Sequence, residues 1–132
     1  MYDSVLLPTD ASAGMDKAVD HAINAAKQYG ATLHVIYVVD TDTYTSYSGD
    51  EYVHEFEGLE SALEGVETES VVRHGVPHEE ILTYADEADV GLTVIGSKNR
   101  SGEYRRLLGS VADRVTRMAD RPVTVVKTPV EE

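Results

Sequence analysis

Short, mostly apolar runs recur along this chain of 132 residues, and segments with helical spacing separate them. The runs cover residues 4–7, 33–39, 90–95 and 123–126. A strand that is apolar on both sides of its pleat has to be covered on both faces, as the strands of parallel sheets are. No hairpin signal joins the first two runs. The pattern therefore predicts βαβ units and an α/β domain with a parallel sheet.

The segments between the runs have the features of helices. After a loop at residues 9–12, apolar residues recur three and four positions apart, and Gly30 stands where a C-terminal cap belongs. The residues of this stripe are Met15, Ala18, Val19, Ala22, Ile23 and Ala26. A third strand is predicted at residues 69–73, and Pro77 suits the first turn of the next helix because its missing N–H would have no partner there. The buried stripe of that helix is expected to be Ile81, Leu82 and Ala85.

Two further helices complete the prediction. A weak one is expected at about residues 51–63. The last one is expected to begin at Gly109-Ser110 and to end before Pro122. Its expected buried face consists of Val111, Val115 and Met118. Five strands and four helices make one doubly wound α/β domain over residues 1–132, with helices on both faces of a five-stranded parallel sheet.

The composition restricts the class of protein further. The length fits one domain, and the absence of cysteine excludes disulfides, thiolate metal sites and a cysteine nucleophile while suiting a reducing cytoplasm. No apolar run approaches the ~20 residues that span a bilayer. Residues 1–4 lack the basic start of a signal peptide. We therefore expect a cytoplasmic protein with no membrane partner.

The net charge of −13 is the most unusual number in the composition. A dense carboxylate surface keeps a protein hydrated at high salt, so we interpret the surplus as a solubility device of a halophilic cytoplasm. An acidic face for a basic partner is the alternative, but no local acidic cluster supports it. Nucleic acid is not an expected partner of the general surface, since phosphate backbones are bound by Lys and Arg.

Positive charge is concentrated in one segment. Residues 96–127 hold eight basic residues and three acids, whereas the rest of the chain holds three basic residues and twenty-one acids. The eight basic residues are Lys98, Arg100, Arg105, Arg106, Arg114, Arg117, Arg121 and Lys127. A chain that avoids positive charge elsewhere and concentrates it here is expected to bind an anion.

Two strand ends have residues suited to a ligand. In open parallel sheets, ligands lie beyond the carboxyl ends of the strands, where the strand order reverses. The residues that follow the first and fourth strands are Pro8, Thr9 and Asp10, and Gly96, Ser97, Asn99 and Gly102. A helix start at Gly109-Ser110 would offer unpaired N–H groups and the positive end of the helix dipole to a phosphate. The plainer alternative makes these glycines ordinary turn residues and Ser110 an ordinary N-cap.

Several common sites are absent from the sequence. It contains no Gly-x4-Gly-Lys-Ser/Thr loop, no Gly-x-Gly-x-x-Gly after the first strand and no Gly-x-Ser-x-Gly elbow. His74 and His78 are four residues apart, but Pro77 between them argues against a metal pair on one helix. Asp10 is the one evident general base, so no catalytic residue is assigned and a phosphotransfer enzyme has no support.

Several segments together match a known signature. Residues 94–97, 109–115 and 121–126 carry a C-terminal motif, and residues 6–10 with Ser12 carry an opening strand and loop. The end of the second strand at 37–40 and the turn at 74–77 fit the same pattern. In these segments the chain resembles the universal stress protein family. The resemblance spans the whole chain and is weakest from residue 40 to residue 67.

The resemblance implies a Rossmann-like fold of the adenine nucleotide alpha hydrolase type, with strand order 3-2-1-4-5. It implies a homodimer in which the last strand, from Val123 to Val126, pairs between subunits. It also implies an ATP site in which Mg²⁺ is held by the phosphates and by Asp10. By the family pattern, the base and ribose are lined by Pro8, Thr9 and Asp10, and adenine is met by the backbone of Val38. The same pattern puts Gly96 near the ribose and phosphates. It assigns phosphate binding to Gly109, Ser110 and Val111.

One position departs from the Gly-x2-Gly-x9-Gly-Ser/Thr pattern of the ATP-binding members, because Asn99 replaces the second glycine. Asn tolerates positive φ, so the turn is expected to persist. Two functions follow. The first is an ATP-binding sensor or regulator of the stress response with at most slow hydrolysis, which the intact Gly96, Gly109 and Ser110 favour. The second is a nucleotide-free dimeric interaction module of the same fold, which Asn99 favours.

Overall fold

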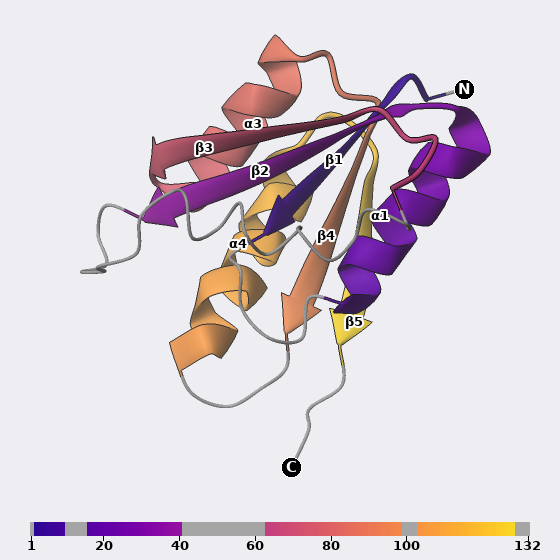
Figure 1. Ribbon diagram of the computed structural model, residues 1–132. Coiled ribbons are helices and arrows are strands. Elements are labelled where there is room, and N and C mark those ends of the chain that lie inside the picture. The colour runs from indigo at the N-terminus through magenta and orange to yellow at the C-terminus, as the bar shows by residue number, and fades with distance from the viewer. Residues whose placement is uncertain (1, 10–15, 41–62, 99–102, 129–132) are drawn as a thin grey trace.

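The computed structural model describes residues 2–9, 16–40, 63–98 and 103–128, which form one twisted sheet with helices on both faces (Figure 1). The strands are β1 (Ser4–Thr9), β2 (Thr32–Asp40), β3 (Thr68–Gly75), β4 (Leu92–Lys98) and β5 (Val123–Thr128). The helices are α1 (Asp16–Tyr29), α3 (Pro77–Glu87) and α4 (Glu103–Met118). The strand order is β3-β2-β1-β4-β5 and every pair is parallel, which confirms the predicted fold class.

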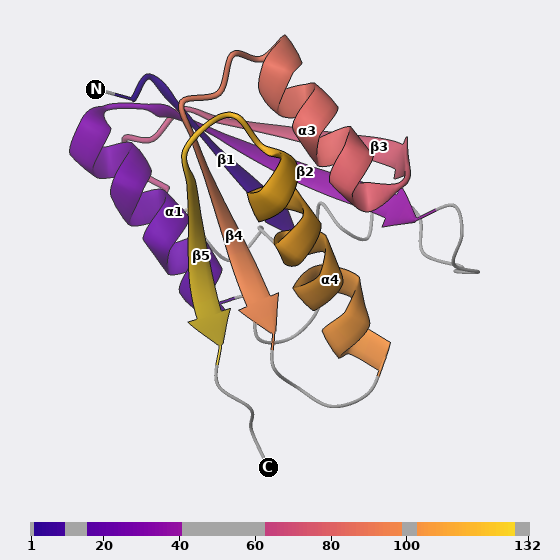
Figure 2. The same cartoon turned by 180° about the vertical axis from the view of Figure 1, so that it is seen from behind.

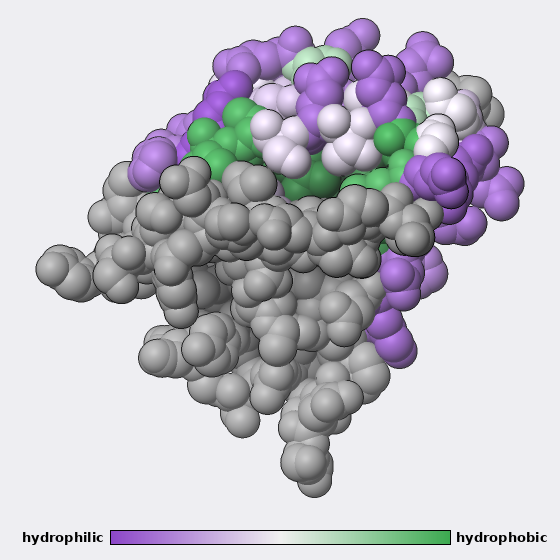
Figure 3. Space-filling view, in the orientation of Figure 1, coloured by the Kyte–Doolittle hydropathy of each residue, from purple (hydrophilic) through white to green (hydrophobic). Residues whose placement is uncertain are grey.

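The helices cover the two faces unequally. α1 lies on one face and packs against β1, β4 and β5, while α3 and α4 lie side by side on the other (Figure 2). All six residues of β1 are buried between these layers, which explains why its sequence does not alternate. On the α1 side, hydrophilic residues follow the upper margin of the described surface and apolar residues lie beneath them (Figure 3). None of the described helices is both long enough and apolar enough to cross a membrane.

The two middle strands separate toward their carboxyl ends. β1 pairs with β2 from Ser4 to Thr9 but with β4 only at Val5 and Leu6. Pro8 fits such a position because its ring nitrogen cannot donate a ladder hydrogen bond. The strand was expected to stop before Pro8, and it continues through this residue to Thr9. The separation opens the carboxyl edge, which is the side of the sheet where all five strands end.

The predicted helix caps are confirmed. Gly30 follows α1 with a φ of 62°, the left-handed conformation that glycine adopts at helix ends without strain. Pro77 occupies the first turn of α3, preceded by Val76 in an extended conformation. In α3, Ile81 and Ala85 are buried as expected, whereas Leu82 is only half-buried.

Two predictions about α4 are wrong. The helix begins at Glu103, so Gly109 and Ser110 lie in its second turn and do not open it. The residues before Gly109 are mostly good helix formers, whereas one glycine inside a helix costs only about 1 kcal/mol relative to alanine. Met118, the last residue of α4, is 60% exposed and does not share the buried face of Val111 and Val115.

The remaining sequence predictions concern the segment at residues 51–63, the bounds of β4 and the histidines on either side of Pro77. The weak helix expected at 51–63 lies mostly outside the described residues. β4 runs from Leu92 to Lys98 and not from residue 90 to residue 95, so Gly96 belongs to the strand. His74 is in β3 and His78 is in α3, and the described residues contain no group of three or more potential metal ligands.

Candidate functional site

The site predicted at the carboxyl edge centres on the gap between β1 and β4. The β1–β4 register pairs Leu6 with Thr93, so three residues further along Thr9 and Gly96 lie at the same level on opposite sides of the gap. Thr9 is buried, and Gly96 is buried and pairs with Val126 of β5. The chain passes from β1 to β2 on one side, and β4 flanks β1 on the other, so the gap is the switch point at which doubly wound domains hold ligands.

Three further predicted residues lie on the elements around this gap. Thr9 pairs with Tyr37 of β2, so Val38 is one residue further toward the carboxyl edge and is half-buried. Pro8 is fully buried beside Thr9. Val111 is buried in α4, which packs on β4. The structure thus brings strand ends from β1, β2 and β4 together, as the sequence predicted.

The remaining predicted residues are described in part or not at all. Asp10, Asn99 and Gly102 lie outside the described residues. Ser97 is described only as a backbone position in β4. Gly109 and Ser110 are likewise described only as backbone positions in α4.

The basic segment does not form one patch. Strands point toward the carboxyl edge and α4 runs back from it, so Lys98, Lys127 and the start of α4 lie at that edge, whereas Arg117 and Arg121 lie at the opposite one (Figure 2). Arg117 is 2.9 Å from Asp113 in an exposed i,i+4 pair. Only part of the positive charge that the sequence concentrates is therefore available to an anion at the gap.

Arg121 has a structural task that the sequence did not reveal. Its guanidinium donates hydrogen bonds to Asp86 at 3.3 Å, to Asp89 at 3.1 Å and to the carbonyl oxygen of Val90 at 2.9 Å. The hydrogen bond to Asp89 is the main cause that raises the pKa of Arg121, with a further contribution from Asp86. Arg121 thereby joins the start of β5 to the end of α3 and cannot serve a ligand at the carboxyl edge.

A second polar cluster lies between α3 and the neighbouring strands β2 and β3. The hydroxyl of Tyr84 is 2.8 Å from Nδ1 of the buried His34, and burial raises the pKa of Tyr84. Arg73 stacks on the Tyr84 ring and pairs with Glu87 at 2.7 Å and Glu80 at 3.7 Å. One weak signal for this cluster is visible in the sequence, a histidine inside an apolar run. These charges are satisfied among themselves and hold α3 on the sheet.

The fold is a doubly wound α/β domain, and the gap between β1 and β4 lies at its switch point, the position at which such domains commonly hold ligands. The sequence model of the universal stress protein family matches residues 1–127. A universal stress protein of Methanocaldococcus jannaschii is 36% identical over an alignment of 146 residues that covers 100% of this chain and 86% of the relative. The universal stress protein YxiE of Bacillus subtilis is 32% identical over 148 residues, covering 96% of this chain and 100% of the relative. The chain belongs to the universal stress protein family.

Solved structures share the fold. A universal stress protein crystallised in complex with cAMP has a TM-score of 0.70 at 24% identity, covering 97% of this chain and 99% of the other. A universal stress protein of Archaeoglobus fulgidus in complex with dAMP has a TM-score of 0.66 at 24% identity, covering 96% of this chain and 98% of the other. Both complexes contain an adenine nucleotide.

Proposed function

We propose that this protein binds an adenine nucleotide in the gap between β1 and β4, and that the preferred ligand is ATP with Mg²⁺. In this proposal the protein acts as a cytoplasmic sensor or regulator in the stress response. The observation that carries the proposal is the separation of β1 from β4 beyond Leu6, with Thr9 and Gly96 facing each other across it. Family membership and the nucleotides in two structures of the same fold support it. Turnover, if present, is slow.

The proposed roles follow the geometry of the strand ends. Pro8, Thr9 and Asp10 line the base and ribose, and the backbone of Val38 meets adenine. Gly96 lies by the ribose, where the absence of a side chain lets the ligand approach the strand. Asp10 takes part in binding the Mg²⁺ that the phosphates carry.

Phosphate binding by Gly109, Ser110 and Val111 requires a change in α4. Inside a helix these N–H groups are engaged with carbonyl oxygens four residues earlier, and a helix leaves only its first four N–H groups unpaired. Those four now begin at Glu103. We therefore propose that nucleotide binding unwinds residues 103–108, so that the helix then begins at Gly109.

Calorimetry with ATP and MgCl2 at high salt tests the site and the unwinding together. Gly109→Ala stabilises the helical form by about 1 kcal/mol, so ATP binding should weaken by about fivefold. Thr116→Ala is the matched control, because Thr116 is an exposed α4 residue far from the proposed phosphate site. Asn99→Gly should bind equally well or more tightly if the Asn99 side chain crowds the phosphates, and a loss of about tenfold would instead make it a phosphate donor.

The second candidate is the nucleotide-free interaction module. The helical conformation of Gly109 and Ser110 favours it, because it leaves their N–H groups occupied. Absence of binding heat in both the parent protein and Asn99→Gly would establish this alternative and end the nucleotide proposal. Mass spectrometry of ligands released from freshly purified protein gives an independent answer.

We also propose that the protein is a homodimer joined along β5 and that its acidic surface is an adaptation to a salt-rich cytoplasm. β5 is an edge strand, and its Val125 is 37% exposed. An apolar edge strand is a liability that proteins usually pair or cover.

A further inference from the structure

The end of β2 extends past the end of β1 at the carboxyl edge of the sheet. The β1–β2 ladder has its last registered pair at Thr9 and Tyr37, whereas β2 continues through residues 38–40. Among the described strands, β3 alone pairs with this end of β2, beginning with Val38 opposite Arg73. The position of the β2 end therefore depends on how firmly β3 is held.

The peptide groups of Val38 face the side of β2 on which β1 lies. In a strand, the N–H and C=O of one residue point to one neighbouring strand, and those of the next residue point to the other. Thr32 donates a hydrogen bond to Asp3, just before β1, at 3.0 Å. Leu33 donates one to Glu67, just before β3, at 2.8 Å. Because an even number of positions separates Thr32 from Val38, the Val38 carbonyl oxygen points to the β1 side, one residue past the last β1 pair.

A carbonyl oxygen at this place can distinguish the two purines. Adenine carries at C6 an amino group, which donates hydrogen bonds, whereas guanine carries there an oxygen, which only accepts them. The Val38 carbonyl can therefore bind the amino group of adenine, and it repels the oxygen of guanine. This difference depends on the exact position of β2, because a hydrogen bond weakens steeply when its angle is poor.

Arg73 joins the end of β2 to the helix layer. Its peptide groups face β2, because an even number of positions separates it from Glu67, which accepts a hydrogen bond from β2. Its guanidinium is 2.7 Å from Glu87 and 3.7 Å from Glu80, both in α3. The guanidinium carbon also lies 5.3 Å from the centre of the Tyr84 ring. Since α3 lies across β2 and β3 (Figure 2), Arg73 anchors the edge strand to this helix.

Two neighbouring contacts support the anchor. A side chain at Gly75 would place its Cβ 2.8 Å from Oε2 of Glu80, so glycine leaves space for the carboxylate that reaches Arg73. Tyr84 is itself fixed, since its hydroxyl is 2.8 Å from Nδ1 of the buried His34 in β2. The helix α3 is thus joined to β3 through Arg73 and to β2 through His34.

We propose that Arg73 is a positioning residue of the nucleotide site: by anchoring β3 to α3 it sets the Val38 carbonyl where it selects adenine over guanine. This inference rests on the proposed function, since it assumes that a nucleotide binds in the gap between β1 and β4. Arg73 acts through the backbone and does not itself bind the ligand, because Glu87 and Glu80 engage its guanidinium.

Calorimetry with ATP and with GTP, each with MgCl2 at one fixed KCl concentration, measures the selectivity. The parent should bind ATP more tightly than GTP. Arg73→Gln removes the charge that pairs with α3, so it should weaken ATP binding by about fivefold and change GTP binding by less than about twofold. Arg73→Lys keeps the charge without the planar group that stacks on Tyr84, so it should restore part of the selectivity. Glu87→Gln should act like Arg73→Gln but less strongly, because Glu80 remains.

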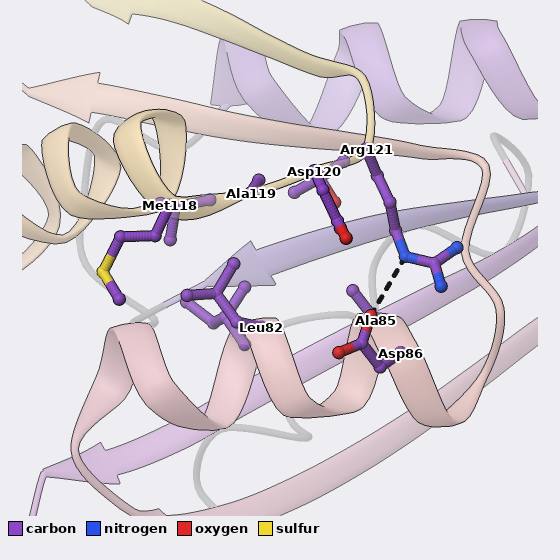
Figure 4. A pocket seen from close by; sticks show the side chains of 10 residues that line it. Leu82, Ala85, Asp86, Met118, Ala119, Asp120 and Arg121 are labelled. Atoms are coloured by element: carbon purple, nitrogen blue, oxygen red, sulfur yellow. Dashed lines mark hydrogen bonds and ion pairs between the residues drawn. The ribbon is translucent and has the colours of Figure 1, made fainter.

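Amide hydrogen exchange without nucleotide tests the anchor separately. In Arg73→Gln the amides of residues 38–40 should exchange about fivefold faster, whereas the amide of Leu33 at the start of β2 should not change. Arg121→Gln is the matched control, because Arg121 also pairs with two carboxylates near the end of α3, one of them Asp86 (Figure 4). Its ion pairs lie at the opposite edge of the sheet, so their loss should lower stability without changing the ratio of ATP to GTP affinity.

Four results would overturn the inference and leave the proposed function intact. They are equal affinity of the parent for ATP and GTP, equal weakening of both nucleotides by Arg73→Gln, an equal loss of selectivity in Arg121→Gln, and unchanged exchange at residues 38–40 in Arg73→Gln. Absence of binding heat with both nucleotides in the parent and in Asn99→Gly would instead end the proposed function, and this inference with it.

Discussion

Val115 and Met118 are three residues apart on α4, yet the structure assigns them opposite environments, with exposures of 1% and 60%. Val115→Ala removes two carbon atoms from the interior. At about 0.8 kcal/mol for each buried carbon the transfer part is about 1.6 kcal/mol. The cavity left behind raises the expected loss of stability to about 2–3 kcal/mol. Met118→Ala removes atoms that are mostly in water already, so its expected effect is within about 0.5 kcal/mol.

Thermal unfolding at 1 M KCl and fixed protein concentration measures the difference. The unfolding entropy of a chain of 132 residues is about 0.28 kcal/mol/K, from about 2.1 cal/mol/K per residue. The Val115→Ala variant should therefore melt about 7–11 °C below the parent, and the Met118→Ala variant within about 2 °C of it. Equal shifts for the two variants would show that α4 presents a different face to the sheet.

Further predictions concern salt, pH and assembly. The melting temperature should rise steeply between 0.01 and 1 M KCl, as the Debye length falls from about 30 Å to about 3 Å and carboxylate repulsion is screened; a flat profile would contradict the halophilic interpretation. Burial raises the pKa of Tyr84 above its ordinary 10.0, so the folded state favours the neutral phenol. The contribution of Tyr84 to the folding stability is therefore present below pH 10.0 and is lost as the pH rises through the raised pKa. Tyr84→Phe should reduce that alkaline loss in denaturant titrations from pH 9 to pH 11, and an unchanged profile would refute the assignment. Light scattering at micromolar concentration should give a dimer for the parent and a 14.4 kDa monomer for Val125→Lys; a monomeric parent would exclude the β5 interface.

Local patterns were sufficient for much of the fold. The unbroken apolar run of β1, the glycine after α1 and the proline at the start of α3 each specify an element through contacts within a few residues, and each prediction is confirmed. The start of α4 was not predicted correctly, because a preference for Gly109 and Ser110 at a helix start is weaker than the helical tendency of the residues before them. The strand order came from the resemblance to a family, and the register confirms it.

The candidate site was predictable in its residues but not in its geometry. Thr9 and Gly96 were identifiable as strand ends, whereas the separation of β1 from β4 depends on where their pairing stops, which no local pattern encodes. Arg121 was counted with the residues that would attract an anion. Its partners Asp86 and Asp89 are more than thirty residues earlier in the chain. A contact across that distance exists only after α3, β4 and β5 have packed together.

The two outer strands of the sheet differ in a way that limits growth of the sheet. In β3, Glu69 is exposed and Arg73 forms ion pairs with carboxylates of α3. An incoming strand at the free edge of β3 would therefore meet charged side chains, some of which are already paired. β5 offers valines at the other side. If copies could add at both sides, each addition would leave a new open edge and assembly would continue into fibres. If copies pair along β5 as proposed, each copy uses the one receptive edge among the described strands, and assembly would end at two chains.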